Sequence, residues 1–290
     1  MDWERDLPSW SLHETSQRIV NGPHRWHVQI VGQGPDLLLL PGAGSSTHTW
    51  RDLIPDLAKH FRVIAPDLPG QGFTQSPNAS RSGLPEMVED LTDLASVQRW
   101  APVAIIGHSA GAAIALRLFQ TLGTPKIIGI NPALDNFEGV AGWLFPILAK
   151  LLAANPFTAN VFTLGATTGR ARRLIEGTGS KISDEGLSFY TRLTADRDHV
   201  NGALQMMARW SLDELLDDLP NISAQVLFLT GANDKAVPPD VADRAAERLP
   251  NARVRRIEGL GHLAHEENPA LVLQEVLTFL DQKVAASRAP

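Results

Sequence analysis

The 290-residue sequence contains no cysteine. Disulfide bonds, thiolate metal sites and cysteine nucleophiles are therefore all excluded. The acidic and aromatic start, MDWERDLPSW, also lacks the basic region and the apolar stretch of a secretory signal. Both features fit a reducing compartment, and we expect a cytoplasmic protein.

Strong charge of one sign and long apolar runs are missing as well. The formal net charge is -6 without a run of like charges, which gives no reason to expect a nucleic-acid partner. No uninterrupted apolar run approaches the ~18 residues of a membrane-spanning helix. The most apolar segment, residues 143–157, is broken by Pro146, Lys150 and Pro156. With 43% hydrophobic residues, the composition predicts a soluble globular protein without a transmembrane segment.

Short runs rich in Val, Ile and Leu recur along the chain, and segments of helical length separate most of them. Most of these runs are too short for helices and too continuous for half-exposed strands, which favours strands buried on both faces. The predicted strands are 26–31, 36–40, 62–65, 103–106, 126–130, 225–230 and 253–257, and the clearest helical segments are 85–100, 110–122, 239–249 and 269–284. The alternation predicts an α/β fold, an open and mostly parallel sheet with helices on both faces.

Residues 132–220 interrupt this alternation. They contain no strand-like run, but helical patterns rich in Leu, Phe, Trp and Met that are punctuated by Gly, Pro and Asn. We interpret them as a helical cap, or lid, inserted into a core formed by residues 1–131 and 221–290. The sequence shows no internal repeat and no low-complexity linker, so we do not expect an independent domain.

The sequence GHSAG at 107–111 stands where the predicted strand 103–106 meets a helical segment. A Gly-x-Ser-x-Gly turn of this kind is tight and strained, and it lifts the serine hydroxyl toward a substrate. The two glycines and the serine of this motif also occur at this spacing by chance in roughly one chain in ten of this length. The surroundings of Ser109 therefore decide between a nucleophile and an ordinary tight turn.

Three other strand ends carry chemically apt residues. Asp234 follows strand 225–230, and His262 follows strand 253–257. Ligands bind beyond the carboxyl ends of strands in an open parallel sheet, so these side chains are expected beside Ser109. His262 would remove the hydroxyl proton and Asp234 would orient the imidazole. The Gly-rich loop after strand 36–40 supplies the Ala43 N–H, which with the Ala110 N–H would form an oxyanion hole.

The motifs GHSAG, GANDKAVPP, GLGHLAHEENP and PDLPGQG together resemble the α/β-hydrolase superfamily across nearly the whole chain. A narrower set resembles the magnesium-chelatase accessory proteins of bacteriochlorophyll biosynthesis, and it comprises MDWERD, RWHVQ, THTWRDL, LLAANPF, RLIEGTGS and GHLAHEENP. The resemblance implies an α/β-hydrolase fold with a cap, a Ser-Asp-His triad and no cofactor.

The narrower resemblance implies a link to magnesium insertion into protoporphyrin and leaves two functions open. The first is a serine esterase-like hydrolase acting on a small apolar or porphyrin-like ester. The second is a non-catalytic tetrapyrrole-binding accessory factor, with magnesium chelatase subunits as partners.

Two positions depart from the superfamily pattern. Pro41 precedes Gly42 where a histidine is common, and a proline cannot donate a hydrogen bond, so the loop loses a polar anchor. Gln71 stands where a Gly-His-Gly turn usually carries histidine. Neither change removes a member of the predicted triad.

Each predicted site residue has a structural alternative. Asp234 could cap the helix that begins near Pro238, and Asp135 is its rival as the acid. His265 competes with His262, while His108 and His199 are interpreted as structural residues. We predict an apolar pocket lined by His48, Trp50, Trp143, Met206 and Trp210, although the same cap residues could form only a helical core or touch a membrane surface. No His, Asp or Glu cluster has metal-ligand spacing, so no bound metal is predicted.

Overall fold

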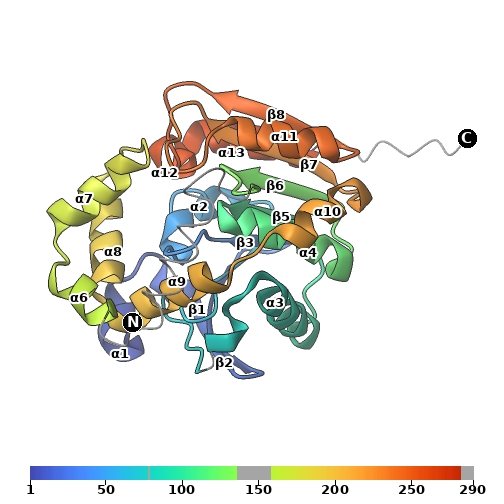
Figure 1. Ribbon diagram of the computed structural model, residues 1–290. Coiled ribbons are helices and arrows are strands. Elements are labelled where there is room, and N and C mark those ends of the chain that lie inside the picture. Colours follow the sequence, from blue (N-terminus) through green and yellow to red (C-terminus); the bar gives the residue numbers. More distant parts are fainter. Residues whose placement is uncertain (78, 136–157, 282–290) are drawn as a thin grey trace, which may run out of the picture.

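An eight-stranded sheet forms the centre of the computed structural model, which describes residues 1–77, 79–135 and 158–281 (Figure 1). The strands are β1 (Ser16–Asn21), β2 (His24–Val31), β3 (Asp36–Leu40), β4 (Arg62–Pro66), β5 (Pro102–His108), β6 (Lys126–Ile130), β7 (Gln225–Gly231) and β8 (Ala252–Ile257). Their order across the sheet is β1-β2-β4-β3-β5-β6-β7-β8. From β4 to β8 all neighbours are parallel, whereas β2 pairs antiparallel with both β1 and β4. The predicted open, mostly parallel sheet is confirmed.

The helices of the described residues alternate with the strands in the core and follow one another between β6 and β7. They are α1 (Trp3–Asp6), α2 (Ile54–Leu57), α3 (Leu84–Gln98), α4 (Ala110–Leu122), α6 (Thr158–Leu164), α7 (Thr168–Gly177), α8 (Asp184–Ala195), α9 (Arg197–Arg209), α10 (Asp213–Asp218), α11 (Asp240–Arg248), α12 (Ala264–Glu267) and α13 (Pro269–Asp281). None of the helices in this part of the chain is long and apolar enough to cross a membrane.

Both faces of the sheet are covered, as the continuous apolar runs predict. Along β3, Leu38 and Leu40 pack into a core with residues of α3, α4, α10 and α11. Leu37 and Leu39 point to the other face and pack with residues of α2, α12 and α13. Successive side chains of a strand point to opposite faces, so a fully buried strand needs apolar residues at every position.

The helices between β6 and β7 lie beside the carboxyl ends of the strands. Figure 1 shows α6, α7 and α8 as an arc at one side of the sheet, while α9 and α10 return along it toward α4. Trp10 and Phe73 pack with Phe189 and Leu193 of α8 in a third apolar cluster. Helix α8 therefore rests on the N-terminal segment and on the loop after β4.

Candidate functional site

Ser109 occupies a sharp turn between β5 and α4. Its backbone dihedral angles are φ 51° and ψ -117°, which non-glycine residues rarely adopt. A Cβ on Gly107 would lie 2.2 Å from the carbonyl oxygen of Gly111, and one on Gly111 would lie 2.2 Å from that of Leu40. Glycine is therefore required on both sides of the serine, because the helix and β3 approach the strand end too closely for any side chain.

Asp234 and His262 meet beyond the ends of β7 and β8. His262 Nδ1 lies 2.8 Å from Asp234 Oδ2, and the Asp234 side chain is almost fully buried. The same carboxylate accepts hydrogen bonds from Asn131 Nδ2 at 2.7 Å and from the N–H groups of Ala236 and Val237 at 2.8 and 2.9 Å. These donors fix the carboxylate so that it receives the Nδ1 hydrogen of His262, which leaves the Nε2 lone pair available.

His108 connects the serine turn to the His262 segment. Its Nε2 lies 3.0 Å from the His262 carbonyl oxygen, and the two rings are 4.8 Å apart. Burial lowers the pKa of His108 to about 3, so the ring is neutral and Nε2–H is the donor. The Ser109 hydroxyl is half-buried and has no hydrogen bond to any residue that the structure describes. Proton transfer between Ser109 and His262 therefore stays a prediction.

The loop after β3 passes beside Ser109. A Cβ on Gly42 would lie 3.1 Å from Ser109 Cβ and 2.8 Å from His108 Nδ1, and the Ser45 N–H donates to the Gly42 carbonyl at 3.2 Å. Within the described parts of the chain, the Ala43 N–H has no hydrogen-bond partner. Ala110 opens α4, and the first N–H groups of a helix have no partner within it. The role of the Ala43 and Ala110 N–H groups as oxyanion donors stays a prediction.

Two side chains outside this loop anchor it, and sequence reasoning missed both roles. Gln71 Oε1 accepts from the Gly44 N–H at 2.6 Å, and His199 Nε2 lies 3.2 Å from the Gly44 carbonyl oxygen. The loop that carries Pro41 therefore has two polar anchors from other elements. The departure at Gln71 from the usual histidine of this turn was a sequence signal for its role. No local sequence pattern indicated the role of His199.

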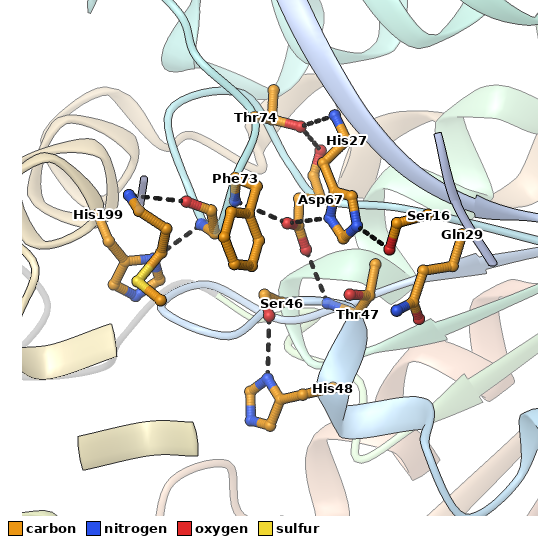
Figure 2. A network of polar contacts seen from close by, with 12 residues as sticks. Ser16, His27, Gln29, Ser46, Thr47, His48, Asp67, Phe73, Thr74 and His199 are labelled. Atoms are coloured by element: carbon orange, nitrogen blue, oxygen red, sulfur yellow. Dashed lines mark hydrogen bonds and ion pairs between the residues drawn. The ribbon is translucent and has the colours of Figure 1, made fainter. Parts of the chain in front are cut away.

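A buried carboxylate holds the neighbouring loops together. Asp67 Oδ1 accepts from the Thr47 N–H at 2.7 Å, and Oδ2 accepts from the Phe73 N–H at 2.8 Å and lies 2.7 Å from His27 Nδ1. Figure 2 shows Asp67 between Phe73 and His27, which lie to either side of it, with the segment of Ser46 and Thr47 below. His199 reaches the network from the side opposite to His27 (Figure 2).

The two rivals for the acid and the base are engaged elsewhere. Asp135 forms a salt bridge with Arg244. His265 is fully buried, with Nε2 2.6 Å from Thr49 Oγ1, and burial holds its pKa well below 6.5. Asp135 therefore does not lie beside His262, where Asp234 lies. His265 does not bond to Asp234, as His262 does.

Glu266, four residues after His262, forms a buried polar cluster that the sequence did not predict. Its carboxylate accepts from Arg51 Nη1 at 2.6 Å, from Thr49 Oγ1 at 2.6 Å and from the Tyr190 hydroxyl at 2.7 Å. Burial raises the pKa of Glu266, and these three donors oppose that effect. Since Tyr190 belongs to α8, the cluster ties this helix to the segment that carries His262.

The predicted pocket residues lie in different surroundings. Trp50 is fully buried in the core cluster of α2, α12 and α13, 4.8 Å from the His265 ring. His48 is also fully buried, with Nδ1 3.0 Å from Ser46 Oγ. Met206 is buried, Trp210 is half-buried, and both pack with the α3 and α4 core, while Trp143 lies outside the described residues. A pocket formed by these residues stays a prediction.

A cavity of about 720 Å³ opens on the Asp234 side of the site, lined by Glu176, Gly179, Ser180, Lys181, Ala232, Asn233, Asp234 and Lys235. It lies between the loop that follows α7 and the loop that follows β7. Across the residues that the structure describes, no group of three or more His, Cys, Asp or Glu side chains is arranged to hold a metal ion.

Comparisons with known proteins agree with the fold. Residues 37–275 match the alpha/beta hydrolase family. The chain is 47% identical to a "magnesium-chelatase 30 kDa subunit" of Rhodobacter capsulatus, over 90% of this chain and 93% of the relative. It is 27% identical to a pimeloyl-[acyl-carrier protein] methyl ester esterase of Vibrio vulnificus, over 87% of this chain and 97% of that relative. The solved structure of the epoxide hydrolase CorEH aligns with a TM-score of 0.77 at 23% identity, covering 91% of this chain and 98% of that one.

Proposed function

Because the chain belongs to the alpha/beta hydrolase family, we propose that it is a serine hydrolase that cleaves an ester of an apolar, porphyrin-like substrate. The arrangement around Ser109 carries this proposal. Glycine is required on both sides of the serine, the neighbouring Ala43 N–H has no partner among the residues that the structure describes, and a carboxylate orients His262. These are the nucleophile, the oxyanion donor and the base that acyl transfer requires.

The reaction follows from these positions. His262 Nε2 accepts the Ser109 proton while Oγ attacks the ester carbonyl carbon, and Asp234 stabilises the imidazolium that forms. The N–H groups of Ala43 and Ala110 donate to the oxyanion. The intermediate then collapses as His262 gives its proton to the leaving alcohol, and the acyl group stays on Ser109. A water molecule, deprotonated by His262, releases the carboxylic acid and restores the serine.

The biological setting is part of the proposal. The relative of Rhodobacter capsulatus bears the name of a magnesium-chelatase subunit, and 47% identity over 90% of the chain supports a related role here. We place the protein at magnesium insertion in bacteriochlorophyll biosynthesis, with chelatase subunits as partners and residues 132–220 as the cap over the substrate.

The same relative favours a second function. Its name refers to a chelatase and not to a hydrolase, so the fold could serve as a tetrapyrrole-binding accessory factor that needs no turnover. In that function Ser109, His262 and Asp234 would be dispensable, and the cap would bind the porphyrin.

A fluorophosphonate probe and a short aryl ester test the first function. The wild-type protein should be labelled and should hydrolyse the ester, whereas Ser109→Ala should lose labelling and at least 99% of the turnover, since removing the nucleophile eliminates covalent catalysis. A wild-type protein that reacts with neither reagent would contradict the hydrolase.

Magnesium insertion by the chelatase, measured with the Ser109→Ala variant, separates the two functions. Loss of insertion supports the hydrolase, and full insertion supports the accessory factor. Titration with protoporphyrin, followed by its absorbance, tests binding directly, and an unchanged spectrum at micromolar protein would count against a tetrapyrrole ligand.

A further inference from the structure

The peptide groups of Gly44 are held from both sides by buried side chains. Gln71, with no exposed surface, accepts from the Gly44 N–H at 2.6 Å, and the 3% exposed His199 lies 3.2 Å from the Gly44 carbonyl oxygen. Gly44 has a φ of 75°, in the left-handed region that glycine enters without strain. A glycine has the freest backbone of any residue, so its direction here depends on these two contacts.

The bonds of His199 define its tautomer. Its Nδ1 accepts from the Gly72 N–H at 2.9 Å, so this nitrogen carries a lone pair and the hydrogen is on Nε2, facing the Gly44 carbonyl. Burial lowers the pKa of His199 to about 4, which keeps the ring neutral at neutral pH. One imidazole thus bridges the loop after β3 and the turn after β4.

A single face of α9 makes these contacts. His199, Gly202 and Met206 lie three and four residues apart, which places them on one side of a helix. A Cβ on Gly202 would lie 1.9 Å from the Gly70 carbonyl oxygen, so the helix touches the turn backbone to backbone. Met206 Sδ accepts from Gln71 Nε2 at 3.1 Å. The cap helix therefore contacts Gln71 directly and the Gly44 peptide through both anchors.

We propose that His199 and Gln71 are positioning residues that aim the Ala43 N–H at the substrate oxygen, so that α9 of the cap sets the competence of the site. This inference rests on the proposed function, because it assigns Ala43 to the oxyanion. Gly42 is confined by His108 and Ser109 on one side of Ala43, and the two anchors confine Gly44 on the other. A donor must lie about 2.7–3.1 Å from the developing charge to stabilise it, so a small rotation of Gly44 is costly.

The variants His199→Ala and Gln71→Leu test the proposal through the kinetics of ester hydrolysis. We expect kcat to fall by roughly 10- to 100-fold with KM within twofold, since an oxyanion donor acts in the transition state and its complete loss costs about 10²–10³ in kcat. The affinity for an aryl boronic acid, which mimics the tetrahedral intermediate, should fall in proportion. His24→Ala is the matched control, because His24 is equally buried and bonds Asp90 at 2.8 Å, away from this loop. It should keep the wild-type kcat.

Amide hydrogen exchange of residues 42–45, followed by mass spectrometry, gives a readout that needs no turnover. Both variants should exchange in this segment at least tenfold faster than wild type, and His24→Ala should not. Folded variants with wild-type kcat and wild-type exchange in this segment would overturn the inference. If the wild-type protein itself neither hydrolyses esters nor reacts with the probe, the proposed function fails, and unchanged exchange would then reject the anchoring as well.

Discussion

Two residues with uncommon backbone angles, Ser109 and Asn131, lie in the candidate site. Their φ values are 51° and 46°. Conformations of this kind cost about 1–3 kcal/mol and persist where neighbouring contacts impose them. The Ser109 N–H donates to the Ile130 carbonyl at 2.9 Å, and the Asn131 N–H donates to that of Leu229 at 2.7 Å. Strand ends thus hold both residues where the hydroxyl and the Asp234 carboxylate need them.

Replacing Ser109 by glycine should release the backbone strain. Ser109→Gly and Ser109→Ala both lack the hydroxyl and should both be inactive, but the glycine variant should be more stable than the alanine variant by about 1 kcal/mol, because alanine is strained at positive φ. Urea unfolding of the two variants measures the difference. Equal stabilities, or a more stable alanine variant, would show that the turn carries no such strain.

The sequence marked the candidate site residues more clearly than the residues that support them. GHSAG, Asp234 and His262 could be chosen because each follows an apolar run, and the carboxyl ends of parallel strands share one edge. Gln71, His199 and Glu266 could not be assigned in this way, because their partners lie far away in the chain. His199 contacts Gly44 across 155 positions, and Tyr190 contacts Glu266 across 76. No local pattern encodes such pairs.

At the level of elements, a buried hydroxyl links α8 to the core in addition to its apolar contacts with Trp10 and Phe73. Tyr190 donates to Glu266, which also pairs with Arg51, and all three side chains are buried. A buried carboxylate depends on each of its donors because water cannot replace them. The contact therefore contributes to the docking of the cap helix on the segment after His262.

Tyr190→Phe should lower the free energy of unfolding by about 2 kcal/mol, since a hydrogen bond to a charged group contributes about 1.5–3 kcal/mol. Ser188→Ala, on the same helix, removes an exposed hydroxyl that donates only to Glu185 and should change stability by less than about 0.5 kcal/mol. Urea unfolding measures both. Equal effects of the two substitutions would mean that the buried hydroxyl adds nothing.

Most elements of the core followed from hydrophobic pattern alone. The predicted helix 110–122 has the bounds of α4, and the seven predicted strands agree with β2 to β8 within a few residues. The strand β1 was missed because it lies at the edge of the sheet, where all six of its residues are partly or fully exposed and no continuous apolar run is needed. The short α1, α2 and α12 were missed because four residues are too few to show a period.

At the level of the whole molecule, four buried histidines make the fold sensitive to acid. Burial lowers the pKa of His108 to about 3 and that of His199 to about 4, and it holds those of His48 and His265 well below 6.5. Nearby Asp196 and Asp67 oppose the effect at His199 without cancelling it. Below pH 6.5 these histidines therefore bind protons in the unfolded chain but stay neutral in the folded chain until the pH approaches their lowered pKa values.

Stability should accordingly be fully present above about pH 6.5 and decline as the pH falls toward 4, by up to about 1.4 kcal/mol per pH unit for each such histidine. Between pH 6 and 4, the free energy of unfolding of His199→Gln should fall less steeply with decreasing pH than that of wild type. The difference in slope should be up to about 1.4 kcal/mol per pH unit. Urea unfolding at intervals of half a pH unit measures both slopes. Identical slopes would show that His199 is protonated in the folded protein.

The contact between α9 and the turn at residues 70–72 also restricts the movement of this helix relative to the core. Moving α8 and α9 outward would take the Tyr190 donor from the buried Glu266 carboxylate and the His199 ring from the Gly72 and Gly44 peptide groups, at a cost of about 1–3 kcal/mol for each group left without a partner. Any molecule that enters or leaves the candidate site is therefore expected to do so while α8 and α9 stay in place on the core.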